Sequence, residues 1–142
     1  LEDGAVGTFL NHSERKFQDT TSLQQTVERC TQLGLKTLVF ASNLEELGTV
    51  SSYNPTFVAY EPPEFIGSTT ASVTSAQPDI ILKAVETAKT HNLPLIVGAG
   101  IHSKDDVKKS LELGATGIAV AKDILKADDP KKELLDLIEG LK

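Results

Sequence analysis

Five short runs of apolar and β-branched residues recur along the chain and predict β-strands. They cover residues 5–11, 36–41, 56–60, 93–98 and 116–121. Most are apolar at nearly every position and show no alternation with polar residues, which is typical of strands buried on both faces of a parallel sheet. The pattern therefore predicts an α/β protein.

Between these runs, apolar residues repeat at helical spacing and place one apolar stripe on each predicted helix. The four sets are Leu23, Val27, Cys30 and Leu33; Ile81, Ala84, Val85 and Ala88; Val107 and Leu111; and Leu134, Leu137, Ile138 and Leu141. Local signals agree with these helices. Pro78 and Pro130 suit first helical positions. Ser103 with Asp106 forms a capping signature, and Gly34 and Gly114 follow helix ends.

Alternating strands and helices with short connections require right-handed crossovers, which give either an open doubly wound sheet or a barrel. The pattern Leu1-Glu2-Asp3-Gly4-Ala5-Val6-Gly7 returns as Leu111-Glu112-Leu113-Gly114-Ala115-Thr116-Gly117, and this echo favours a barrel of repeated units. Five strands cannot close an eight-stranded (β/α)8 barrel. We therefore expect residues 1–142 to be one partial barrel domain, with three further units of about 80 residues before Leu1.

Charge and composition exclude several classes of partner. The net charge is −6, with 20 acidic against 14 basic residues, so no basic stripe predicts binding to nucleic acid. No apolar run approaches the roughly 20 residues of a membrane span, and residues 1–11 lack the features of a signal peptide, so we expect a cytoplasmic protein without membrane contact. Cys30 is the single cysteine, which excludes an internal disulfide and favours a packed thiol.

Two residues at predicted strand ends are candidates for acid/base chemistry. Glu61 directly follows the third predicted strand, and in a parallel barrel only strand ends meet the active face. His12 follows the first strand. Taken alone it is better explained as a structural histidine, but a helical turn beginning at Ser13 would direct free amides at its ring and keep it neutral. Glu14 is either a supporting polar residue or an exposed carboxylate. We assign no role to His91, near a helix end, or to His102, in a predicted surface turn.

Gly98-Ala99-Gly100 follows the fourth strand and is either a plain tight turn or a phosphate-binding turn, which barrels place after their last strands. No cluster of His, Cys and Asp suggests a metal site, and no cofactor is predicted. The motifs Asn11-His12-Ser13-Glu14-Arg15 and Tyr60-Glu61-Pro62-Pro63-Glu64-Phe65-Ile66-Gly67, in this order, resemble the triosephosphate isomerase family in its compact archaeal form. The resemblance runs through the whole chain, from the fourth to the eighth barrel strand.

The resemblance implies interconversion of dihydroxyacetone phosphate and glyceraldehyde 3-phosphate. This family is a standard example of catalysis by a glutamate base and a neutral histidine electrophile. By the resemblance, Glu61 matches the base and His12 matches the group that polarises the carbonyl. The positions matching the phosphate site are Ile66, Gly67, Gly98, Ala99, Gly100, Ala121 and Lys122.

Two departures and one gap qualify the resemblance. Lys122-Asp123 stands where archaeal relatives usually have Ser-Gly, and the loop from Gly67 lacks the family's second glycine. The family's first strand carries a lysine that sits against the substrate, and no such element is found here. We therefore expect this chain alone to have little or no activity.

Two other functions stay open at this stage. One is another phosphate-binding barrel, such as a lyase or sugar-phosphate epimerase. The other is a non-catalytic assembly piece, whose missing strands come from a complementing N-terminal segment or from self-association into a homo-oligomer, because an isolated five-strand piece would expose its first strand.

Overall fold

Five parallel strands form one sheet in chain order. In the computed structural model, which describes residues 4–66 and 72–142, they are β1 (Gly7–Leu10), β2 (Lys36–Ala41), β3 (Phe57–Tyr60), β4 (Leu95–Val97) and β5 (Gly117–Ile118). Each strand pairs with the next along the chain, and every pairing is parallel. All five predicted strands are confirmed, each within its predicted bounds.

Helices are present at all four predicted positions, although Leu137 is the one buried member of the last predicted stripe. They are α1 (Thr20–Gln32), α2 (Leu44–Ser51), α4 (Pro78–Thr90), α5 (Lys104–Glu112) and α7 (Pro130–Ile138), with the single-turn elements η1 (Ser13–Arg15), η2 (Pro63–Phe65), α3 (Val73–Ala76), α6 (Lys122–Leu125) and η3 (Glu139–Leu141). Pro78 and Pro130 begin their helices, and Ser103 and Asp106 form a complete capping box. Helix α2 is not among the predicted helices.

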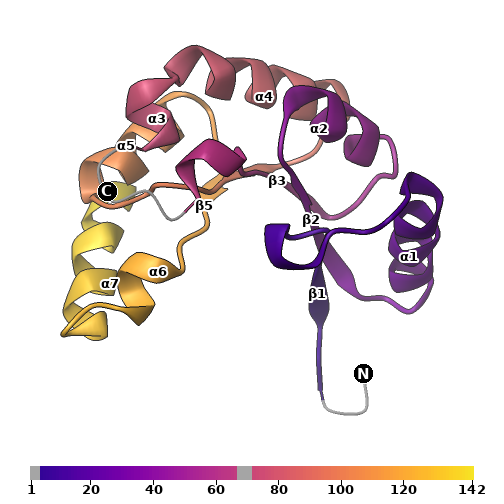
Figure 1. Ribbon diagram of the computed structural model, residues 1–142, viewed down its shortest axis with the longest axis horizontal. Coiled ribbons are helices and arrows are strands. Elements are labelled where there is room, and N and C mark those ends of the chain that lie inside the picture. Colours follow the sequence, from indigo (N-terminus) through magenta and orange to yellow (C-terminus); the bar gives the residue numbers. More distant parts are fainter. Residues whose placement is uncertain (1–3, 67–71) are drawn as a thin grey trace.

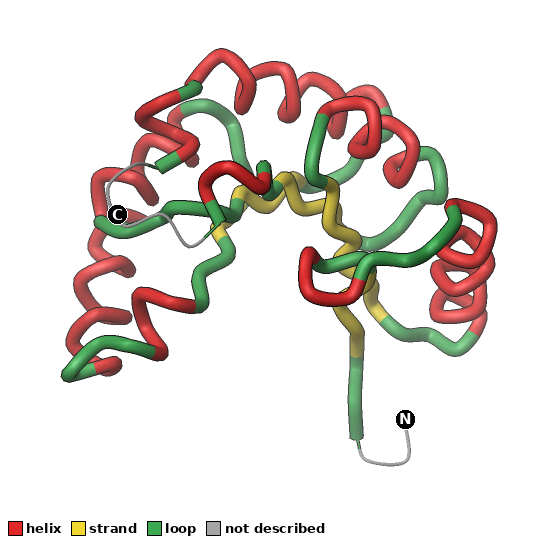
Figure 2. Tube along the Cα trace, in the orientation of Figure 1, coloured by secondary structure: helices red, strands yellow, loops and turns green. Residues whose placement is uncertain are grey.

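The sheet has one covered face and one open face. Figures 1 and 2 show the longer helices as an arc around the outer side of a strongly curved sheet. On that side Val39, Val58 and Val97 are fully buried. A hollow of about 590 Å³ lies against the other face, where its lining includes Phe9, which is 71% exposed. Burial on both faces, predicted from continuous apolarity, is therefore wrong for β1. The predicted exposed edge of the first strand is consistent with the sheet order, because among the described strands β1 pairs with β2 alone.

The carboxyl ends of the strands carry the candidate residues to one edge of the sheet. The loop of residues 11–19, here called the His12 loop, follows β1, and Glu61 follows β3 directly. The turn at Ala99 and Gly100, where both residues have φ of 70°, follows β4, and Ala121 lies beyond β5. Among the described helices, none has the length and apolarity needed to cross a membrane.

Candidate active site

A cavity of about 310 Å³ opens where the strand ends meet. It brings together eight of the predicted site residues, namely His12, Glu14, Glu61, Ile66, Ala99, Gly100, Ala121 and Lys122. Phe9 and Phe40 supply apolar wall from the open face of the sheet. Gly67 lies outside the described residues. Residues distant in sequence are thus gathered by the parallel order of the strands.

The His12 ring is held with its Nε2 edge toward Glu61. His12 caps η1, the predicted helical turn from Ser13, and its Nδ1 accepts a hydrogen bond from the Glu14 backbone N–H at 3.4 Å. Phe40 packs edge-on against the ring, with centroids 4.8 Å apart. Because Nδ1 is the acceptor, the proton of the neutral ring is assigned to Nε2, which lies 3.4 Å from Glu61 Oε2. The ring can therefore present one N–H to a bound molecule.

Glu61 is a carboxylate with limited access to water. Its backbone N–H donates to the Ala41 carbonyl at 2.9 Å, which continues the β2–β3 pairing and fixes the start of the side chain. The side chain is 13% exposed. Burial raises the pKa of the Glu61 carboxyl above its ordinary value, and the attraction of His12 and a hydrogen bond from Ser13 offset this only in part. Raised basicity suits a group that removes protons.

Gly98 makes room for that carboxylate. A Cβ at this position would lie 3.1 Å from Glu61 Oε1, closer than an ordinary van der Waals contact. The Gly98 backbone N–H donates to the Tyr60 carbonyl at 3.0 Å, so the close approach is fixed by the register of β3 and β4. The structure thus places Gly98 behind Glu61, and it does not line the cavity.

The Glu14 side chain is not the part of that residue that supports the ring. Its carboxylate is 86% exposed and 3.9 Å from His12 Nδ1, whereas its backbone N–H makes the hydrogen bond. Of the two interpretations left open above, the geometry favours an exposed carboxylate at a turn start. The supporting contact comes from the main chain.

The prediction that His102 is a solvated histidine in a surface turn is wrong. His102 lines the cavity, and its Nδ1 lies 2.9 Å from Asp123 Oδ1. Within residues 4–66 and 72–142 its buried Nε2 has no hydrogen-bond partner. Asp123 also lines the cavity, and although it stands in place of the family's glycine, the sequence does not indicate His102 as its partner. His91 caps the end of α4, as predicted, and does not line the cavity.

Among the residues that the structure describes, no group of three or more His, Cys, Asp or Glu side chains is arranged to hold a metal ion. The lining of the cavity includes two histidine–carboxylate pairs, the backbone of the turn at Ala99 and Gly100, and Lys122. A buried base facing a ring N–H is the pairing needed for proton transfer next to a carbonyl.

Comparison with known sequences assigns the family. The sequence model of the family described as triosephosphate isomerase matches residues 1–141. The chain belongs to the triosephosphate isomerase family. Triosephosphate isomerases of archaea are among its relatives: that of Methanobacterium bryantii is 42% identical over 142 residues, and that of Thermoplasma volcanium is 40% identical over 136 residues.

The chain is shorter than these triosephosphate isomerases. The alignments cover 99% and 96% of this chain but 62% and 63% of the two relatives. Among solved structures, thiamine phosphate pyrophosphorylase from Pyrococcus furiosus is similar with a TM-score of 0.66 at 19% identity, covering 96% of this chain and 59% of that one. A likeness at this identity supports the parallel α/β fold and carries no information on the reaction.

Proposed function

We propose that this chain carries the acid/base groups of a triosephosphate isomerase that interconverts dihydroxyacetone phosphate and glyceraldehyde 3-phosphate. The observation that carries the proposal is the His12–Glu61 pair, with Nε2 and Oε2 at 3.4 Å on the wall of the cavity at the strand ends. Membership of the family supports the reaction class. The product and substrate are isomers, so the reaction needs proton movement and no other reagent.

In the proposed reaction Glu61 removes a proton from the carbon next to the carbonyl. The electron pair of that C–H bond forms the carbon–carbon double bond of an enediolate, and the carbonyl π electrons move to oxygen. The His12 Nε2–H donates a hydrogen bond to this oxygen and moves a proton between the two substrate oxygens. Glu61 then returns its proton to the neighbouring carbon, which completes the isomerisation with both groups restored.

We assign the phosphate end of the substrate to the opposite wall of the cavity. Backbone amides of the turn at Ala99 and Gly100 and of the segment at Ala121 and Lys122 are the proposed donors, with Ile66 on the wall of the same cavity. Gly67 remains a proposed member of this set on the resemblance alone, since it lies outside the described residues. The described members of this set line the same cavity as His12 and Glu61. Gly98 is reassigned from phosphate binding to the space around Glu61.

We further propose that β1 to β5 are the fourth to eighth strands of a (β/α)8 barrel and that this chain is inactive without the first three. The open face of the sheet, where Phe9 is 71% exposed, supports this proposal. The coverage of about 62% of the relatives' length also supports it. In the family a lysine of the first strand contacts the substrate, and the completing segment would supply it. We expect the completed protein in the cytoplasm.

The test is complementation. The 142-residue chain would be assayed alone and after addition of the N-terminal segment of the Methanobacterium bryantii relative, with a Glu61→Gln chain as the matched control. We expect activity only from the mixture, and loss of that activity when the lysine of the added segment is changed to methionine. Isomerase activity of the purified chain alone at an enzymatic rate, or of the Glu61→Gln mixture, would contradict the assignment.

A non-catalytic assembly piece is the second candidate, and the exposed apolar residues favour it. Besides Val6 and Phe9, Leu125 is 79% exposed and Leu135 is 51% exposed. Monomeric soluble proteins rarely expose large contiguous apolar patches, and Phe9 lines one hollow together with Ile118, Val120 and Leu134. Association into a homo-oligomer that stays inactive after complementation would favour this candidate, and size-exclusion chromatography of the chain measures it.

A further inference from the structure

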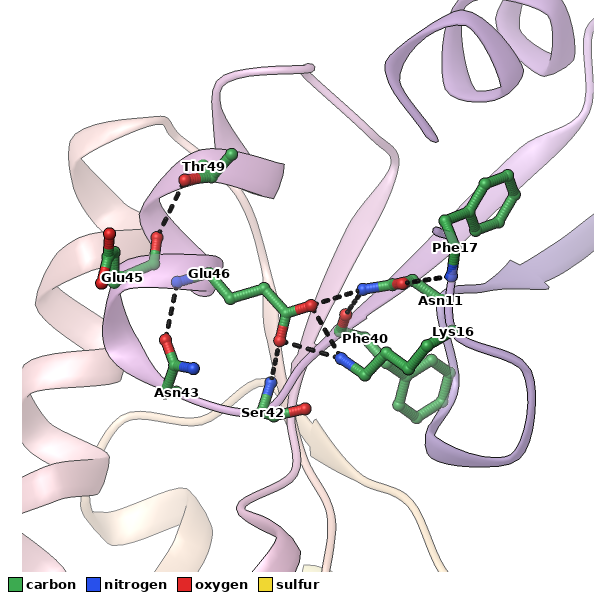
Figure 3. Close-up of polar contacts among 9 residues, drawn as sticks. All are labelled: Asn11, Lys16, Phe17, Phe40, Ser42, Asn43, Glu45, Glu46 and Thr49. Atoms are coloured by element: carbon green, nitrogen blue, oxygen red, sulfur yellow. Dashed lines mark hydrogen bonds and ion pairs between the residues drawn. The ribbon is translucent and has the colours of Figure 1, made fainter. Parts of the chain in front are cut away.

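Glu46 reaches from α2 to two points of the His12 loop, one on each side of η1. Its Oε1 accepts hydrogen bonds from Asn11 Nδ2 and from Lys16 Nζ, both at 2.7 Å. Its Oε2 accepts from the Ser42 backbone N–H at 2.6 Å and from Lys16 Nζ at 2.8 Å. Figure 3 shows the carboxylate at the centre of these contacts, with Asn11 and Lys16 converging on it from the loop. We call Asn11, Lys16 and Glu46 the loop clamp.

The loop clamp lies outside the candidate active site. None of its three residues lines the cavity that holds His12 and Glu61. Although burial opposes ionisation, hydrogen bonds from Lys16, Ser42 and Asn11 hold the pKa of Glu46 below its ordinary value, so the carboxylate is charged at neutral pH. An ionised acceptor strengthens each of these hydrogen bonds.

Asn11 connects the clamp to the residue beside it, His12. It is 4% exposed and has φ of 59°, a left-handed conformation that asparagine tolerates better than most residues. Its Nδ2 also donates to the Phe40 carbonyl at 2.9 Å, and its Oδ1 accepts from the Phe17 backbone N–H at 3.1 Å. One buried side chain thus ties the start of the loop to β2 and to the far end of the loop.

His12 has few contacts of its own. Besides the 3.4 Å approach of Nε2 to Glu61, the ring has a long hydrogen bond from Glu14 at 3.4 Å and the edge-on packing of Phe40, and the side chain is 36% exposed. The position of the ring therefore depends on the backbone that carries it. Displacement of a reacting group by ~1 Å can lower turnover by about 10²-fold, so a rigid loop matters for any reaction at this site.

We propose that Glu46 is a positioning residue for His12. By binding Asn11 before η1 and Lys16 after it, Glu46 fixes the backbone between them and so the direction of the ring. The effect of Glu46 on the His12 ring is argued from the geometry of the chain alone. The effect of Glu46 on turnover rests on the proposed isomerase function.

Ring nitrogen NMR of the 142-residue chain tests this without substrate. In chain labelled with ¹⁵N at histidine, wild-type His12 should show the tautomer with the proton on Nε2. In Glu46→Ala, which removes all four hydrogen bonds, we expect both tautomers and loss of amide protection over residues 11–17. Glu46→Gln preserves size and loses the ion pair with Lys16, so it should be intermediate and folded.

Glu45→Gln is the matched control, because it makes the same change of charge one residue away on the exposed side of α2. It should leave the His12 signals at their wild-type positions. A merely structural role would lower the Tm of Glu46→Gln while leaving the His12 tautomer unchanged, and that result would overturn the proposal. If complementation yields no isomerase activity, the proposed function is wrong, but the NMR test of Glu46 remains valid.

If complementation yields an active isomerase, Glu46→Gln should lower its kcat by about tenfold with little change in KM.

Discussion

Two histidine–carboxylate pairs face the same cavity and differ in how each ring is held. His12 Nδ1 accepts a backbone N–H and directs Nε2 at Glu61 across 3.4 Å. His102 directs Nδ1 at Asp123 across 2.9 Å and leaves Nε2 buried without a partner in the described chain. If both rings are neutral, their protons are therefore on opposite nitrogens.

This difference shows that the partner of Nδ1 decides what a histidine can do in a site. A backbone amide on Nδ1 leaves an N–H on Nε2 for a bound molecule, as at His12. A carboxylate on Nδ1 uses that N–H within the protein, as at His102, and fixes the position of Asp123 instead. The first pair fits proton transfer, and the second fits control of a negative charge near the proposed phosphate end.

The largest effect is expected at the first pair. In the completed barrel Glu61→Asp withdraws the carboxylate by about one methylene, roughly 1 Å, and should lower kcat by about 10²-fold or more with a much smaller change in KM. Steady-state kinetics with each triose phosphate measures this. An unchanged kcat would remove Glu61 from the mechanism and would make the two pairs equivalent in importance.

Crowding the first pair should have the next largest effect. In Gly98→Ala the new Cβ would stand 3.1 Å from Glu61 Oε1, so the carboxylate must shift by a few tenths of an ångström. We expect kcat to fall by about tenfold because the base moves away from His12. In the control Gly48→Ala the nearest atom is Thr87 Cγ2 at 4.0 Å, and the helix should gain up to about 1 kcal/mol. Equal kcat in both variants would mean that Gly98 is an ordinary turn residue.

The second pair should respond to loss of Asp123. In Asp123→Ala, His102 loses its Nδ1 partner, and its proton should move toward Nε2, while the His12 signals stay unchanged; ¹⁵N NMR of the chain at pH 9 measures both rings. Removal of the negative charge should also tighten inhibition of the completed barrel by inorganic phosphate by about threefold. If His102 keeps its tautomer in Asp123→Ala, Asp123 does not set the position of the ring proton, and the proposed difference between the two histidine–carboxylate pairs is incorrect.

The smallest expected effect is the pH dependence of thermal stability, which has opposite signs for the half-buried carboxylates of Glu61 and Glu46. Burial raises the pKa of Glu61, so the folded chain binds the proton of this carboxyl more tightly than the unfolded chain does. The stability that the protonated carboxyl contributes at low pH is therefore lost as the pH rises through the raised pKa. Glu61→Gln should therefore raise Tm at pH 7 and change it little at pH 3.5.

Glu46 provides the opposite case. Burial opposes its ionisation, but its hydrogen bonds lower its pKa, so its stabilisation is present above the ordinary pKa and is lost as the pH falls through the lowered value. Glu46→Gln should lower Tm at pH 7, with a difference that shrinks on acidification. Thermal unfolding at several pH values checks both variants, and shifts of the same sign would show that the two environments are not opposed.

The sequence predicts those features that depend on residues close together along the chain. Continuous apolar runs located all five strands, and the places of His12 and Glu61 at strand ends follow from those same runs. Helix α2 was missed because it has only eight residues, with Gly48 and Thr49 inside it, although Asn43 and Glu46 form a recognisable helix start. Short helices of this kind depend on packing, here through buried Leu47 and Val50.

Contacts between distant segments could not be read from the chain. His102 meets Asp123 only because the turns after β4 and β5 lie side by side, and nothing near His102 in sequence indicates a carboxylate partner. The role of Gly98 likewise depends on the register of β3 and β4, which places its missing side chain against Glu61. Burial on both faces of β1 was overestimated because apolar pattern records what a strand can bury, and in this chain one face is open.

The order of the strands in the sheet has a consequence for synthesis on the ribosome. Because β1 to β5 pair only with their neighbours along the chain, each strand can add to an edge that has already emerged. Domains generally fold from the N-terminal side during translation, at about 5–20 residues per second. Within the described sheet, each of β2 to β5 can therefore pair with the strand before it as it emerges, and only closure of the proposed barrel would pair β5 with a strand distant in sequence.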